Sequence, residues 1–488
     1  MTDFAQRGVT RNTTLLIAAA AAVMLITTGI RQVSGLFVLP IISTTGLSIA
    51  SVSLALAIGQ FMWGAMQPVF GALADHFGAF RIIALGALML AAGAVLTAFS
   101  HSELTLIATM GVLSAAGAAA GSFSILIGGT ARRLQAHQRS TAAGTINAGG
   151  SLGQFVFAPV AQYVIGAWGW AAAMFTLAAS ALVTIPLAFP LRSKAEVPGG
   201  SAGVAAAPGT AARSTLAGAA KSATSGAVTG APAGAEPDAG RSATSNSVPS
   251  APAGAVPGAR RSPASNAGHG SPAGAKPGAI GGAAPLTLRE QLRIAARDRS
   301  YILLNIGFFT CGFHVAFLVT HFPGEIQNCG LLPSVAANAL AIIGLFNVAG
   351  SIGAGMLGQR FRMKHLLAFI YGARAVLIAI YLLMPKTSLN IYLFAAGMGM
   401  TWLATVPPTS GIVGKLFGVR FLGTLFGLTL VSHQIGAFLG AYLGGIAMAR
   451  LHSYQWIWFA DMALALGAAL INLPIREDEP LPRSAVAA

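Results

Sequence analysis

Long apolar segments, each close to the length of a membrane-spanning helix, recur at both ends of the chain. A helix that crosses a hydrocarbon core of about 30 Å needs roughly 20 consecutive, mostly apolar residues. Six such segments precede a polar central stretch, namely Thr14 to Ile41, Leu47 to Gly71, Arg81 to Phe99, Leu104 to Gly129, Thr141 to Ile165 and Trp168 to Phe189. Six more follow it, namely Tyr301 to Phe322, Pro333 to Leu357, Leu366 to Met384, Leu389 to Leu416, Phe421 to Met448 and Tyr454 to Leu473. Because unpaired backbone groups are costly in hydrocarbon, the pattern predicts a transmembrane helix for each of these twelve segments.

The composition agrees with a chain whose solvent is mostly lipid. Hydrophobic residues make up 55% of the 488 positions and charged residues only 9%, a far more apolar balance than in soluble domains. The first apolar segment lacks a small-residue cleavage site and is too long for the core of a signal peptide. It is therefore predicted to be the first helix of an all-α membrane protein.

The positions of the basic residues predict the orientation in the membrane. A formal charge of +16 is large enough to suggest nucleic-acid binding, but the loops and tails on one predicted side hold most of it. The basic residues on that side are Arg7, Arg11, Arg81, Arg132, Arg133, Arg139, Arg360, Arg362, Lys364, Lys415, Arg420, Arg476 and Arg483. The opposite loops hold only Lys386 and Arg450. By the positive-inside rule, both termini and the central stretch are cytoplasmic in an inner-membrane protein, and no nucleic-acid partner is expected.

The central stretch, residues 191–286, has the composition of a disordered linker. Ala, Gly, Ser and Pro dominate it, and it has almost no large aliphatic or aromatic side chain to build a core. A Pro-Ala-Gly-Ala motif recurs in it with a period of 20 residues, after Ala231, Ala251 and Ser271. Without apolar faces to stack, the repeats predict an expanded tether rather than a solenoid, with a regulatory segment as the alternative.

A short amphipathic helix is predicted at residues 287–299, directly after the linker. Thr287 and Glu290 match a capping box, and Leu288 and Leu292 lie one turn apart among arginines. We expect this helix to lie on anionic headgroups, the alternative being an ordinary basic flank of the seventh crossing. The chain then divides into two membrane halves, residues 1–190 and 300–475, and a cytoplasmic tail at 476–488.

The two halves are related in sequence. The segment from Gly46 to Ala57 aligns with the segment from Gly330 to Ala341. At the same offset, the segment from Gly71 to Phe77 aligns with that from Gly355 to Phe361. Repeats of this kind, joined by a long loop, are typical of carriers that place a substrate site at the midplane between two rocking halves.

The loop after the second crossing carries a specific family resemblance. Its sequence, Gly71-Ala-Leu-Ala-Asp75-His-Phe-Gly78-Ala-Phe-Arg81, resembles the signature loop of the major facilitator superfamily (MFS). The family pattern has a small first residue, an acid at the fifth position, Gly at the eighth and a basic residue nearby. The resemblance implies the twelve-helix MFS fold and, for Asp75, a charge contact that closes the cytoplasmic side in one state. The alternative for Asp75 is a solvated turn.

A looser resemblance covers the first and eleventh crossings. Gly29-Ile-Arg31-Gln32-Val-Ser-Gly-Leu-Phe and Ser432-His433-Gln434-Ile-Gly resemble bacterial members near the monocarboxylate and oxalate/formate carrier branch. In that branch, an Arg on the eighth crossing is expected to hold the substrate carboxylate. This sequence has no Arg there, and the nearest, Arg374, lies on the ninth crossing.

Few charged side chains stand inside the predicted helices, and each costs about 2.5 to 3.5 kcal/mol at bilayer depth unless function or pairing accounts for it. The repeat alignment places Arg31 and His314 at equivalent positions of the first and seventh crossings, which line the central cavity in the resembling fold. We therefore expect them to face each other across the axis, with Arg31 holding a carboxylate. Gln32, His433 and Gln434 are further substrate-binding candidates. The alternatives are a snorkelling Arg31 and a packing role for His314.

Arg374 and Asp461 form a candidate structural pair. The ninth and twelfth crossings that carry them are neighbours in the resembling fold, and Asp461 is the acid buried in the second half. The two charges are expected to neutralise each other, so that removing one strands the other at a cost of about 3 to 5 kcal/mol. A substrate-binding role for Arg374 is the alternative.

The residues of the predicted core favour an anionic substrate. No acid stands in the core of the first, fourth, seventh or tenth crossing. We expect a secondary transporter that moves a small organic anion, a mono- or dicarboxylate, by alternating access. Coupling is expected by exchange, or by a proton carried on His314, His433 or the substrate. No cofactor and no metal site are expected.

Other function classes remain open at this point. An exporter of a neutral or drug-like solute and a transporter-like sensor fit the same helices. Gly149-Gly-Ser151-Leu-Gly153 matches a nucleophile elbow, which would suit an intramembrane serine hydrolase, but the elbow needs a strand-to-helix turn and this stretch is predicted to be helical. Primary transport is not expected, since no nucleotide-binding Gly-x-x-x-x-Gly-Lys-Ser/Thr loop is present. The oligomeric state stays open.

Overall fold

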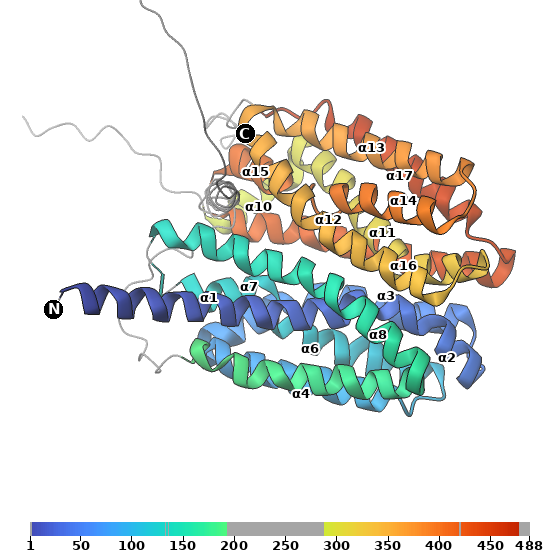
Figure 1. Ribbon diagram of the computed structural model, residues 1–488. Helices are drawn as coiled ribbons and strands as arrows, with labels where there is room; N and C mark the ends of the chain where they lie inside the picture. Colours follow the sequence, from blue (N-terminus) through green and yellow to red (C-terminus); the bar gives the residue numbers. More distant parts are fainter. Residues whose placement is uncertain (1, 132, 135, 193–286, 419–420, 478–488) are drawn as a thin grey trace, which may run out of the picture.

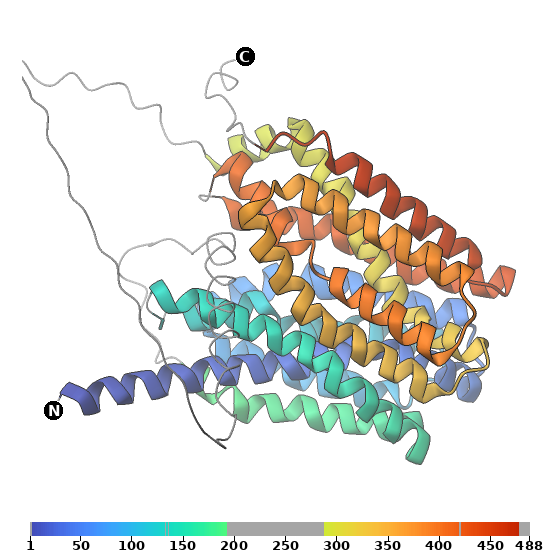
Figure 2. The same ribbon diagram turned by 45° about the horizontal axis from the view of Figure 1, so that its top comes forward.

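The computed structural model describes residues 2–131, 133–134, 136–192, 287–418 and 421–477. Over these residues the chain forms two helical bundles side by side, one from each half of the sequence (Figures 1 and 2). The first holds α1 (Thr2–Gln32), η1 (Ser34–Phe37), α2 (Val38–Thr45), α3 (Ile49–Phe77), α4 (Ala79–Thr97), α5 (Glu103–Leu106), the π-helical η2 (Ile107–Ser114), α6 (Ala115–Ala120), α7 (Phe123–Ala131), α8 (Ala136–Leu187) and η3 (Phe189–Leu191). The second holds α10 (Leu288–Arg297), α11 (Arg299–Asn328), α12 (Pro333–Arg360), α13 (Met363–Leu383), α14 (Ser388–Thr401), α15 (Val406–Phe417), α16 (Leu422–Leu451) and α17 (Gln455–Asn472).

These helices account for the twelve predicted crossings. Ten stretches of the described chain are long and apolar enough to span a membrane. One of them, Ala142–Leu187, is broken at Gly169, whose φ of 85° and ψ of 168° are not helical, so it makes both the fifth and the sixth crossing. The 18 residues of α17 make the last crossing. The prediction of an all-α fold with two six-helix halves is confirmed.

One hydrophobic core contains residues of both halves; it extends through the second half, and the first half joins it toward the end of the molecule opposite to the N-terminus, on the right in Figure 1. There Phe37 of the first half is buried in the same cluster as Phe317 and Phe322 of α11. The chain at η1 approaches α11 so closely that a Cβ on Gly35 would lie 2.0 Å from the carbonyl oxygen of Val319. No residue other than glycine fits here, so the main chains of the two halves contact each other directly at this end.

The end that holds the start of α1 is packed differently. A second hydrophobic cluster, which includes Leu16, Phe70, Ile83, Leu126 and Ile146, draws all of its described members from the first half. The first half therefore keeps a core of its own at this end, where the other end has a shared one. Between the two ends, α3 packs on α16 and α8 packs on α12.

α10 begins with the capping box that the sequence predicts. The Thr287 hydroxyl accepts a hydrogen bond from the main-chain N–H of Glu290, and the Glu290 carboxylate accepts one from that of Thr287. Ala295 is buried while Leu288 is exposed. The predicted linker at 191–286 lies outside the described residues after Arg192, as does the predicted tail after Glu477.

Candidate functional site

Arg31, at the last turn of α1, lies against one face of α3. Its Nη1 donates to Oε1 of Gln60 over 2.6 Å, and its guanidinium carbon lies 4.2 Å from the centre of the Trp63 ring. Gln60, Trp63 and Gly64 stand at helical spacings of three and four, so they share one face of the helix, here called the α3 face. The Nε of Arg31 has no partner among the described residues. Arg31 is thus held in place while keeping hydrogen-bond donors to spare.

Gln434 reaches the same α3 face from the second half. A Cβ on Gly64 would lie 2.2 Å from Cγ of Gln434, so this α16 side chain packs directly on that turn of α3. Gln32, beside Arg31, is buried, and its Oε1 has no partner within the described chain. The structure therefore brings Arg31 and Gln434, from different halves, to one turn of one helix.

His433 faces α11 instead of the α3 face. Its ring lies 5.0 Å from the ring of Phe308. The helices are close here, since a Cβ on Gly312 would lie 1.8 Å from the carbonyl oxygen of His433. His433 therefore lies between α11 and α16, one residue from Gln434 in the chain.

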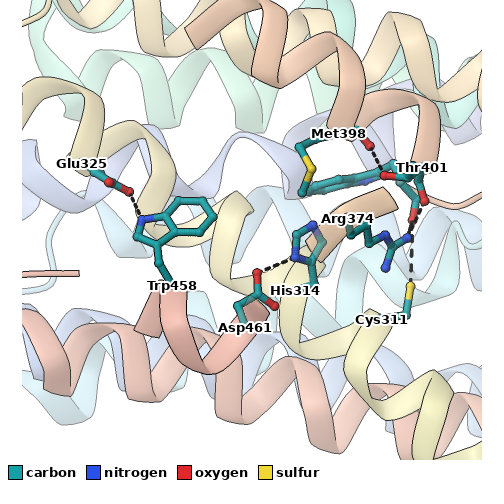
Figure 3. Close-up of polar contacts among 9 residues, drawn as sticks. Cys311, His314, Glu325, Arg374, Met398, Thr401, Trp458 and Asp461 are labelled. Atoms are coloured by element: carbon teal, nitrogen blue, oxygen red, sulfur yellow. Dashed lines mark hydrogen bonds and ion pairs between the residues drawn. The ribbon is translucent and has the colours of Figure 1, made fainter. Parts of the chain in front are cut away.

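His314 contacts α17, whereas the sequence predicted that it would face Arg31. Its Nδ1 lies 2.5 Å from Oδ2 of Asp461, and both side chains are fully buried (Figure 3). His314 lies on the predicted seventh crossing, but the orientation of its side chain follows the buried carboxylate. An unpaired carboxylate in this interior would cost several kcal/mol, so the imidazole turns toward it.

Arg374 does not form the predicted ion pair with Asp461, which pairs with His314. Instead, its Nη2 donates to the carbonyl oxygens of Thr401 and Trp402, over 2.6 Å for the latter (Figure 3). These carbonyls are available because the tenth crossing is not helical between Thr401, where α14 ends, and Val406, where α15 begins. Buried carbonyls without a helical partner need another donor, and the guanidinium supplies one.

Asn347 of α12 supports the same break from the other side. Its Oδ1 accepts a hydrogen bond from the main-chain N–H of Leu403 over 3.1 Å, and its Nδ2 donates to Oγ of Ser151 over 3.0 Å. Sequence reasoning missed both Asn347 and the break. The available signals were an Asn inside an apolar segment and the Pro407-Pro408 pair, which cannot continue a helix without losing hydrogen bonds.

Ser151 does not have the surroundings of a nucleophile. It lies inside α8 rather than on a strand-to-helix turn, and its hydroxyl accepts from an amide on α12. That bond joins the first half to the second, so Ser151 serves packing between the halves. Within the described residues, no three His, Cys, Asp or Glu side chains are placed to hold a metal ion.

The signature loop forms a tight turn at the end of the molecule where α1 begins. α3 ends at Phe77 and α4 begins at Ala79, and between them Gly78 has φ 91° and ψ 142°. Only glycine adopts this conformation without strain. Asp75 and Arg81 are exposed on either side of the turn, and Gly71 faces open space. The gating role of this loop stays a prediction.

Comparisons with known proteins give one consistent result. A family model described as Major Facilitator Superfamily matches residues 15–441. The chain is similar to the uncharacterized MFS-type transporter YcxA of Bacillus subtilis (strain 168), with 25% identity over 189 residues, 37% of this chain and 45% of that protein. It is also similar to monocarboxylate transporter 11 of Mus musculus, with 31% identity over 140 residues, 29% of this chain and 30% of that protein. The chain thus spans less than half the length of either relative.

A solved structure extends the likeness to the whole fold. The D-xylose-proton symporter matches with a TM-score of 0.63 at 13% sequence identity, over 95% of this chain and 98% of that one. At this level of identity the match concerns the arrangement of helices alone.

Proposed function

Because the chain belongs to the major facilitator superfamily, a family of multi-pass membrane transporters, we propose that it is a secondary active transporter that carries a small organic anion by alternating access. The hydrolase alternative is set aside, because members of this family are transporters and not enzymes. The substrate class we propose is a mono- or dicarboxylate. The observation that carries this proposal is the contact of Arg31, from α1, with the α3 face.

The chemistry of this face suits a carboxylate. A guanidinium offers a planar fork of donors that matches the two oxygens of a carboxylate. The side chains that hold Arg31, Gln60 and Trp63, are neutral, so its positive charge is not cancelled by these contacts. Gln434 adds an amide from the opposite half, so a solute bound here would touch both halves that must move. The similarity to a monocarboxylate transporter supports the same substrate class.

The packing of the two halves supports alternating access. With both termini cytoplasmic, as the positive-inside rule predicts, the shared core at Phe37 and Phe322 lies on the outer side. This core and the Gly35 contact would then close the outer side, while the first half keeps a separate core on the inner side. We infer an inward-facing state, in which Asp75 of the signature loop takes part in closing the cytoplasmic side during the other half of the cycle.

Exchange across a membrane tests the proposal. Proteoliposomes preloaded with an unlabelled solute are assayed for uptake of labelled mono- and dicarboxylates, sugars and organic cations. Wild-type protein should show saturable carboxylate exchange. Arg31→Gln should lose at least about tenfold in kcat/KM, since a hydrogen bond to a charged group contributes about 1.5 to 3 kcal/mol.

Two further variants separate charge from geometry. Arg31→Lys keeps the charge but not the fork, so it should recover only part of the exchange rate. Arg293→Gln removes a charge from the exposed face of α10, distant from Arg31 in the sequence. This variant should exchange as the wild type does. Transport of only neutral or cationic solutes, or normal exchange by Arg31→Gln, would contradict the proposed substrate class and site.

A further inference from the structure

A buried ionisable pair in the second half lies outside the proposed anion site. The pair consists of His314 on α11 and Asp461 on α17, joined at 2.5 Å and fully buried (Figure 3). Each partner keeps one polar atom, Nε2 of His314 and Oδ1 of Asp461, that has no hydrogen bond to the described residues. Buried polar groups are almost always satisfied, so an unsatisfied pair of this kind calls for a role beyond packing.

The groups around the pair define its charge. Among the described residues, Cys311 of α11 and Arg374 of α13 lie beside the pair in Figure 3, and both bond the carbonyl oxygen of Trp402. Tyr371 packs on Arg374, with 5.3 Å from the guanidinium carbon to the ring centre, and His433 stands where α16 packs on Gly312. The broken segment of the tenth crossing contributes the neutral Trp402, whose ring lies 6.2 Å from that of His314 and whose carbonyl holds Arg374. With His314 neutral and Cys311 a thiol, the formal charges of Arg374 and Asp461 cancel. A proton on His314 leaves one positive charge in excess.

An excess charge in this interior is unfavourable unless a negative charge comes near. An organic anion is such a charge. α16 borders both places, since its main chain at His433 packs on Gly312, two residues before His314, and the adjacent Gln434 packs on the α3 face. A favourable interaction between the bound anion and the bound proton acts in both directions. Binding of either one therefore raises the affinity of the protein for the other.

We propose that the His314–Asp461 pair is the site of the coupling proton, which binds to the imidazole together with each organic anion and leaves with it on the other side. The loaded pair is an imidazolium held by a carboxylate, and the empty pair is a neutral imidazole held by the same carboxylate. This inference rests on the proposed anion transport and assigns its coupling to symport with a proton.

The same helix offers a matched control. His321 is also fully buried on α11, but its Nε2 lies 2.7 Å from the carbonyl oxygen of Ala441 and its Nδ1 3.4 Å from the hydroxyl of Tyr454. These partners are neutral, so a proton on His321 has no carboxylate to hold it. Substitution of His321 should therefore leave coupling intact.

The experiment compares two modes of transport in proteoliposomes. In the first, a gradient of one pH unit, acidic outside, drives uphill uptake of a labelled monocarboxylate. At a stoichiometry of one proton per anion, the concentration inside should reach about ten times that outside. In the second, counterflow at equal pH on both sides reports anion exchange alone. His314→Gln and Asp461→Asn should lose uphill uptake and keep counterflow within about threefold. His321→Gln should keep both.

Asp461→Asn can lower the folded yield, because it leaves Arg374 without a buried counter-charge. His314→Gln, which keeps Asp461, is therefore the deciding variant, and counterflow itself shows which proteins are folded. Carboxylate-induced alkalinisation of a weakly buffered medium gives a second readout, present in wild type and absent from the His314 variant.

The possible results separate this inference from the proposed function. Uphill uptake that survives in a His314→Gln protein overturns the assignment of the proton site. Wild-type counterflow without proton-driven uptake overturns symport but leaves the anion carrier standing. Absence of carboxylate counterflow in the wild type refutes the anion carrier itself.

Discussion

Asn347 occupies the point where the broken tenth crossing meets the first half of the molecule. One buried amide serves three partners: its Oδ1 accepts from the main-chain N–H of Leu403 and from the hydroxyl of Ser351, and its Nδ2 donates to the hydroxyl of Ser151. The main-chain N–H inside the break has lost its helical acceptor, so Oδ1 of Asn347 satisfies a group that would otherwise be buried without a partner. A single side chain therefore maintains both the break and a polar contact between the halves.

Asn347→Ala should destabilise the protein in detergent by about 1 to 3 kcal/mol, because the N–H of Leu403 stays buried without an acceptor. Thermal unfolding of purified protein measures the change. Asn338→Ala is the matched control, since Asn338 is exposed on the same helix and should be nearly neutral. Equal stability of the two variants would show that the amide does not support the break.

The sequence identified most of the ionisable residues of the core, but it missed the buried His321 and it did not give the partners of the others. Arg31, His314, Arg374 and Asp461 were all singled out because each is charged or titratable within an apolar segment. Their partners depend on the rotation of each helix about its axis and on main-chain groups released by a break. Neither of these can be read from the spacing of apolar residues. The predicted Arg374–Asp461 pair was therefore wrong, and Asp461 contacts His314 instead.

At the scale of elements, the apolar pattern predicted all of the crossings because their lengths are imposed by the bilayer. The internal irregularities escaped it. The fourth crossing contains the π-helical segment η2, and the tenth is broken between Thr401 and Val406, whereas the break at Gly169 lies next to the predicted boundary between the fifth and sixth crossings. A break or a π segment hardly changes the mean hydropathy of a crossing or the spacing of its apolar residues, so the apolar pattern does not reveal it.

The first turn of α13 depends on a carboxylate from another part of the chain. Glu477, which follows α17, accepts hydrogen bonds from the main-chain N–H groups of Met363 and Lys364, both at 3.1 Å, and pairs with Lys415 at 2.5 Å. Burial alone would raise the pKa of Glu477, but the Lys415 contact and the two N–H donors outweigh it and lower the pKa from its usual value of 4.5. The carboxylate thus caps the first turn of α13, where negative charge is favourable.

The lowered pKa fixes the pH at which this cap acts. The unfolded chain binds the proton more tightly than the folded chain, so the stabilisation is fully present above about pH 4.5 and is lost as the pH falls through the lower folded pKa. Glu477→Gln should therefore cost about 1 kcal/mol at pH 7 and progressively less below pH 4.5.

Thermal unfolding between pH 3.5 and pH 7, with the exposed Glu103→Gln as control, measures the effect of the Glu477 substitution. A deficit that stays constant across this range would mean that the carboxylate charge of Glu477 plays no part in the cap.

At the scale of the whole molecule, closure of the end opposite to the N-terminus depends on Gly35. A Cβ at this position would lie 2.0 Å from the carbonyl oxygen of Val319, so Gly35→Ala should hold this end apart and slow exchange by about tenfold or more. Gly372→Ala on α13 is the control, because a Cβ there meets nothing within 4 Å.

Spin labels at Ser43 and Asn328, both exposed at that end, report the separation of the halves. The labels are placed in a Cys311→Ser/Cys329→Ser background. The distance distribution between the labels should shift to longer values in Gly35→Ala alone. An unchanged distribution in that variant would mean that the approach of η1 to α11 does not control closure.

The contact at Gly35 also bears on how such a carrier diversifies. The closest contact there joins main chain to main chain and requires only that position 35 stay glycine, whereas recognition of the solute is assigned to Arg31 and the side chains around it on the α3 face. Mutations that alter the solute range therefore fall on positions other than those that close the protein. Selectivity is free to drift among descendants of this chain while the mechanical part of the cycle is inherited unchanged.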